Sequence, residues 1–221
     1  MLNTRQFHNT TTLAANIENS LLFIWFNKFH NQTIKSNTSI TEKLRYSEHS
    51  EDFSKRITIN YFNNDTSNIY SKSQRDHQTK QGTIGNQMDV IANAKFKNQQ
   101  SLYVANNDYT PKNYNNNVRI PVKSHGLNHY QNYSNIYFNI ALNLNSHQNN
   151  ILQNLGFSEE EIYTSITVET YYQSVMRTCL RNPESTEPVT IIVPDITIAT
   201  ELNIILGNGA TDRKSTRLNS S

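Results

Sequence analysis

Residues Val189–Asp195 read VTIIVPD, and TIATELNIIL follows at Thr197–Leu206. The first stretch is an almost unbroken run of apolar, largely β-branched residues, which is typical of a strand covered on both faces. The second stretch indicates a helix. A fully covered strand followed by a helix predicts an α/β fold in which a mainly parallel sheet lies between two layers of helices.

The same alternation extends upstream to about residue 86. MDVIANAKF at 88–96 predicts an amphipathic helix, and SLYVANND at 101–108 predicts a buried strand that ends in polar residues. VRIPV at 118–122 is a second extended segment, and NIYFNIAL at 135–142 is a third strand. We therefore assign residues 86–211 to one three-layer α/β lobe.

Two helices are expected before the decisive strand, at about Ser146–Leu155 and from about Ser158 to Arg181. Ser158 and Glu161 have the spacing of a capping box, in which the hydroxyl accepts from a backbone amide and the carboxylate reaches back. Pro183 then ends the second helix.

Residues 1–85 carry a weaker pattern. A helix at 13–29 and a strand at 57–62 are expected, separated by polar clusters. The apolar run at 21–26 is far shorter than the roughly 18 residues that span a bilayer, so no membrane segment is predicted. We interpret residues 1–85 as a linker or the end of a preceding domain.

The last ten residues, Asp212–Ser221, read DRKSTRLNSS and match the translation of a common sequencing adapter residue for residue. We interpret 212–221 as a non-native tail and exclude it from the sequence-based fold assignment, although a basic tail that contacts nucleic acid is the alternative. On this interpretation the native chain continues beyond Thr211.

Composition sets loose limits on function. The formal net charge is +2 and charged residues make up 17% of the chain, which is too mild to predict a nucleic-acid binder from charge alone. The single cysteine, Cys179, excludes an internal disulfide and a cysteine cluster for zinc. A reducing compartment, the cytoplasm, is expected.

Gln173, Arg177 and Arg181 recur every four residues in the expected helix and should share one face. Guanidinium groups bind phosphate oxygens through paired donors and stabilise charge in phosphoryl transfer. A solvated helix face is the alternative explanation of this spacing.

A polar loop precedes the strand at 135–142. Gly126 would let the backbone approach a ligand closely, and Ser124, His125 and Asn128 offer hydrogen bonds to phosphates. An ordinary loop is the alternative. His125 and His129 have no third ligand nearby in the sequence, so no metal site is expected.

In their order and separation, these two segments resemble motifs V and VI of superfamily-two (DEAD/DEAH-type) helicases. Gly126, Leu127 and Asn128 match the core of motif V, and His125 stands where an arginine is common. The resemblance implies that this loop, from Ser124 to Asn128, holds the backbone of DNA or RNA.

Gln173 and Arg177 match motif VI, whose glutamine and arginines face ATP. Met176 replaces the usual glycine, and Arg181 lies one position later than the usual finger arginine. With the strand at 101–108 placed like motif IV, the run from 86 is similar to the RecA-like C-terminal lobe of helicase-like proteins of phages and mobile elements.

The resemblance implies an ATP-dependent helicase or translocase whose ATP and Mg²⁺ are bound mainly by an N-terminal lobe. The sequence contains no GxxxxGK[ST] phosphate loop, and no DExx motif follows a strand in its first half. We therefore expect a fragment that is inactive alone and needs the missing lobe as its partner. The alternative is a non-catalytic nucleic-acid-binding or interaction protein with the same fold.

Overall fold

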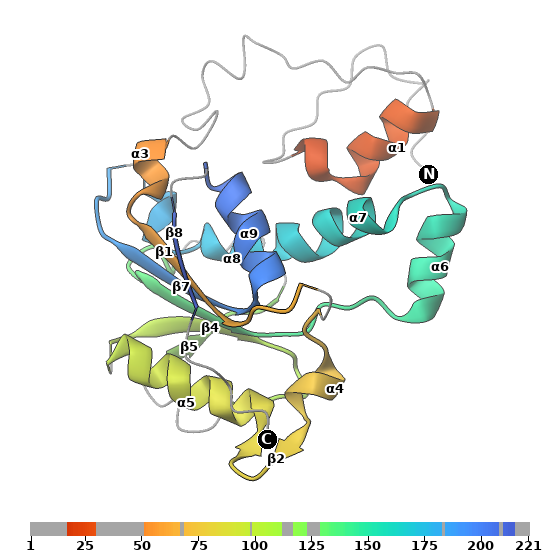
Figure 1. Cartoon of the computed structure of the whole chain (residues 1–221). Helices are drawn as coiled ribbons and strands as arrows, with labels where there is room; N and C mark the ends of the chain where they lie inside the picture. The colour runs from red at the N-terminus through yellow and green to blue at the C-terminus, as the bar shows by residue number, and fades with distance from the viewer. Residues whose placement is uncertain are drawn as a thin grey trace.

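The computed structural model of the chain (Figure 1) describes residues 17–29, 51–66, 69–97, 99–111, 117–122, 129–182, 184–207 and 210–214. Its main sheet is built from β1 (Ile57–Asn63), β4 (Ser101–Ala105), β5 (Asn117–Arg119), β6 (Asn135–Asn139), β7 (Val189–Asp195) and β8 (Thr211–Lys214). The strand order is β5-β4-β6-β7-β1-β8. Every pairing in this sheet is parallel.

Helices cover both faces of the sheet (Figure 1). Helix α5 (Ile84–Phe96) lies on one face, and α8 (Glu169–Val175) and α9 (Ile196–Ile205) lie on the other. The expected three-layer α/β, RecA-like class is therefore confirmed. The remaining elements are α1 (Leu21–Phe29), α3 (Glu51–Ser54), α4 (Lys72–Arg75), α6 (Ser146–Asn154), α7 (Glu159–Ile162), 3-10 helices at Ile17–Asn19 and Cys179–Arg181, and a small hairpin of β2 (Gln78–Thr79) and β3 (Gly82–Thr83).

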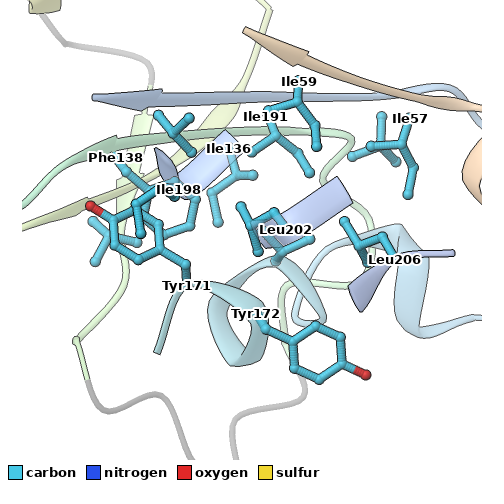
Figure 2. Packing of buried hydrophobic residues seen from close by; sticks show 14 of the residues in the cluster. Ile57, Ile59, Ile136, Phe138, Tyr171, Tyr172, Ile191, Ile198, Leu202 and Leu206 are labelled. Carbon is cyan, nitrogen blue, oxygen red and sulfur yellow. The ribbon is translucent and has the colours of Figure 1, made fainter. Parts of the chain in front are cut away.

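Strand β7 has the burial pattern that its sequence predicts. Ile191 and Val193 pack into the core beneath α8 and α9, whereas Ile192 faces the second core beneath α5. All three are 0% exposed. Figure 2 shows the first core, in which Ile57, Ile59, Ile136, Phe138 and Ile191 of the sheet meet Tyr171, Tyr172, Ile198, Leu202 and Leu206 of the helices.

The boundary that we expected at residue 85 is wrong. Strand β1 lies inside the sheet, paired with β7 from Ile57↔Val189 to Asn63↔Asp195, and with β8 on its other side. Ile57 and Ile59 are 0% exposed and belong to the main core. Residues from β1 onward are therefore part of the lobe, because their apolar faces are buried by it.

Strand β8 includes Asp212–Lys214, the first three residues of the segment that we interpret as adapter-derived. They extend the sheet beside β1 through the register Thr58↔Thr211 to Tyr61↔Lys214. Pairing at a sheet edge uses backbone groups that every sequence carries. The origin of the tail thus remains a sequence-based prediction.

The account of the core predicts a sharp contrast between two isoleucines. Ile191→Ala should lower the free energy of unfolding by about 2–4 kcal/mol, because it opens a cavity in a fully buried strand. Ile204→Ala on α9 should change it by less than about 1 kcal/mol, since Ile204 is 52% exposed. Urea unfolding measures both. Equal losses would contradict the assignment of β7 to the core.

Candidate functional site

The helix expected over 158–181 begins where the sequence predicts, at Ser158, but it ends before residue 181. Ser158 and Glu161 form the predicted capping box: Glu161 N donates to Ser158 Oγ at 3.2 Å, and Ser158 N donates to Glu161 Oε2 at 2.8 Å. The chain then continues through α7, a π-helical segment at Tyr163–Val168, and α8. Helix α8 ends at Val175.

The expectation that Gln173, Arg177 and Arg181 share one helical face is therefore wrong. Thr178 adopts an extended conformation, and its hydroxyl donates to Val175 O at 2.7 Å and accepts from Leu180 N at 3.3 Å. This side chain competes with the helix for backbone groups, as threonine often does. The two arginines are placed by a turn and a 3-10 helix instead.

Arg177 and Arg181 nevertheless lie close enough to interact. Arg177 is only 8% exposed. Burial lowers the pKa of the Arg177 guanidinium, and the positive charge of Arg181 lowers it further. Two like charges held together in a partly desolvated place gain stability from an anionic ligand. This arrangement suits phosphate oxygens.

These arginines belong to the amino-terminal edge of the sheet. Cys179 N donates to Tyr133 O at 2.9 Å, just before β6 begins, and Thr190 N donates to Ser134 O at 2.9 Å. The segment that carries the arginines is thus tied to the end of the connection that leads into β6.

Arg56 is a third arginine at this edge, and the sequence analysis missed it. Its Nη1 donates to the carbonyl oxygens of Ser185 and Glu187, the latter at 3.3 Å. The guanidinium also lies 5.1 Å from the centre of the Phe53 ring. Arg56 therefore fixes the loop that follows Arg181. No spacing rule pointed to it, because it precedes β1 and is far from the motifs in sequence.

Gln173 has a partner within its own helix. Its Nε2 donates to Glu169 Oε1 at 2.7 Å, an i to i−4 contact on α8. The expected ATP-facing glutamine is thus engaged by a carboxylate. The loop residues Ser124, His125, Gly126 and Asn128 lie outside the described part of the chain, so the structure places only the flanks of that loop, Pro121 and Val122 on one side and His129 on the other.

The opposite, carboxyl-terminal edge of the sheet carries a polar cluster around Arg75. Arg75 is only 2% exposed. It donates to Asp76 at 2.7 and 2.9 Å, and to Asn106 at 3.1 Å, and its guanidinium lies 4.9 Å from the Tyr109 ring centre. Asp108 accepts from Lys72 at 3.0 Å and from Arg75 at 3.5 Å.

Two buried carboxylates hold the layers together near the same edge. Asp89 on α5 accepts from Tyr137 at 3.0 Å and from Asn139 at 2.9 Å, both on β6, and from the Tyr109 hydroxyl. Asp195 caps α9 by accepting from Ile198 N at 3.0 Å. Burial raises the pKa of Asp195, although backbone amides that donate to it oppose the rise.

Among the residues that the structure describes, no three side chains of His, Cys, Asp or Glu lie close enough together to hold a metal ion. No helix within the same ranges is both long and apolar enough to cross a bilayer.

Comparison with protein-family models, with curated proteins and with solved structures finds no match to this chain.

The buried arginine on α4 gives a pH-dependent prediction. Lys72 and then Arg75 hold the pKa of Asp108 below its usual value, and Arg75 lowers that of Asp76. Stability from these depressed pKa values is present above the unfolded value of about 4 and is lost as pH falls through the folded values. Arg75→Met should therefore reduce the free energy of unfolding by about 1–2 kcal/mol near neutral pH, and by less near pH 3.

Urea unfolding at the two pH values measures this difference. Lys95→Met, which removes an exposed cation from α5, is the matched control and should change little at either pH. A loss for Arg75→Met that is equal at both pH values would show that packing, and not charge pairing, accounts for its effect.

Proposed function

We propose that this chain is the C-terminal lobe of an ATP-dependent nucleic-acid helicase or translocase, acting together with a separate ATP-binding lobe in the cytoplasm. One observation supports this most strongly. The strand that resembles motif IV, β4, and the segment that resembles motif VI, which leads into β7, belong to one parallel sheet, and the residues that resemble motif V come between them in the chain, after β5 and before β6.

Arg177 and Arg181 are proposed to contact the phosphates of ATP. Burial and, to a smaller extent, the neighbouring charge of Arg181 lower the pKa of Arg177, and phosphate oxygens would accept hydrogen bonds from both guanidinium groups. The adjacent lobe would hold ATP, which carries the phosphoryl group, and Mg²⁺, which would neutralise part of the phosphate charge. The arginines would orient and stabilise the γ-phosphate oxygens.

Gln173 has a smaller role in this proposal than the resemblance implies. Its amide is already engaged by Glu169, so it would have to exchange that partner to reach ATP. In a protein that does not hydrolyse ATP, Gln173 would keep its hydrogen bond to Glu169. This observation favours the second candidate function, a non-catalytic nucleic-acid-binding or interaction protein with the same fold.

The loop from Ser124 to Asn128 is proposed to hold the nucleic-acid backbone. The residues that precede it, Pro121 and Val122, follow the carboxyl-terminal end of β5, and loops at this edge commonly bind ligands in parallel α/β folds. Hydroxyl, imidazole and backbone donors would contact phosphates without reading bases. Either DNA or RNA would be accepted.

The catalytic part of the proposal is tested in the intact enzyme. Arg177→Ala should lower ATP turnover by at least about 100-fold while nucleic-acid affinity changes little, because the guanidinium would act on ATP and not on the strand. Arg181→Ala provides a less buried second variant, and Lys95→Ala is the control. Unchanged turnover in a folded Arg177→Ala enzyme would remove the arginines from the mechanism and favour the non-catalytic alternative.

The loop gives a separate prediction. His125→Ala and Ser124→Ala should weaken binding to every single-stranded sequence by a similar factor, since both groups would touch the backbone. Fluorescence anisotropy on strands of different composition measures this. A loss confined to one sequence would contradict backbone contact.

A further inference from the structure

A hollow of about 350 Å³ opens at the carboxyl-terminal edge of the sheet, on the opposite edge from the arginine pair. Its walls come from α4, the loop after β4, and the segments that follow β5 and β6. The volume lies at the lower end of the range for small-ligand sites. The residues that line it are Lys72, Asn106, Asn107, Asp108, Val122 and Leu142.

One wall of the hollow is held rigidly. Asn106 pairs with the backbone of Ala141 in both directions, donating through Nδ2 at 3.0 Å and accepting from Ala141 N at 2.9 Å. Arg75 adds a third contact to Asn106 from behind. The loop of residues 106–108 is thus preorganised beside β6, which favours recognition of a ligand with a defined shape.

The charges around the hollow cancel. Lys72 and Arg75 are balanced by Asp76 and Asp108, and both carboxyls keep a depressed pKa, so they are ionised at neutral pH. A phosphate would meet the Asp108 carboxylate as readily as the Lys72 ammonium. The hollow is therefore a poor place for a backbone phosphate.

The lining suits a flat, polar and uncharged group. The side chains of Lys72 and Asp108 remain 56% and 52% exposed although they are paired, so both can still bind a ligand. Val122 and Leu142 provide apolar surface. An ionised carboxylate only accepts hydrogen bonds, and its two oxygens have spare acceptor capacity.

We propose that this hollow receives one nucleobase of a bound single strand, and that Asp108 accepts hydrogen bonds from a guanine edge while Val122 and Leu142 contact the ring. Guanine fits best because its N1–H and N2 amino group present two adjacent donors. Asn107 would bind a remaining acceptor. The inference rests on the proposed nucleic-acid function, and adds base preference to a lobe whose other contacts read only the backbone.

The full chain and labelled single-stranded oligonucleotides test this by fluorescence anisotropy. We expect a strand alternating dG and dT to bind about fivefold or more tightly than oligo-dT, as a good carboxylate-to-base contact would give. A strand alternating deoxyinosine and dT should lose most of that preference, because inosine lacks the N2 amino group.

Asp108→Ala should abolish the guanine preference while oligo-dT binding persists, since Asp108 would touch the base and not the backbone. Asp65→Ala, which removes an exposed aspartate from the loop after β1, should keep the preference. Asn107→Ala is a second variant at the hollow and should reduce the guanine preference. It serves as the test if Asp108→Ala does not fold.

The remaining outcomes separate the inference from the proposal on which it rests. Equal affinity of the wild-type chain for all three strands would overturn base recognition and leave the proposed backbone binding in place. If the folded Asp108→Ala and Asn107→Ala variants keep the guanine preference, base recognition at the hollow is also overturned. An absence of binding to any strand would overturn both.

Discussion

Strand β7 must hide apolar side chains on both of its faces, and most of the architecture follows from that constraint. Ile191 and Val193 require a helical layer on one side, and Ile192 requires another on the other side. A strand buried on both faces also needs hydrogen-bonded neighbours at both edges. β6 and β1 supply these, so segments separated by more than a hundred residues are joined in one sheet.

The way in which β7 ends is equally constrained. Asp195 is 1% exposed, and a buried carboxylate is tolerated only where donors surround it. The first turn of α9 provides one through Ile198, and Tyr70 N provides another at 3.2 Å. The same side chain therefore starts the covering helix and holds the chain that leads to α4.

Sequence reasoning worked where a segment carried its own signal. VTIIVPD, the helix after it and the Ser158 capping box were predictable because periodicity and capping chemistry are local. β1 was assigned to the wrong domain because its burial comes from partners far along the chain. The end of α8 was missed because Thr178 has an ordinary helix propensity, and only its hydroxyl contacts show the competition. The burial of Arg75 could not be predicted because its partners Tyr109 and Asn106 are distant in sequence.

The two edges of the sheet differ in their chemistry: Arg177 and Arg181 lie at the amino-terminal edge, and the hollow at the carboxyl-terminal edge is lined by one cation, one carboxylate, two amides and two apolar side chains. The most direct test of the helicase account is long-read resequencing of the gene from its source. The account predicts an upstream phosphate loop and acidic motif in the same frame, with native sequence after Thr211. A frame that starts at Met1, with neither motif in an adjoining gene, would contradict it.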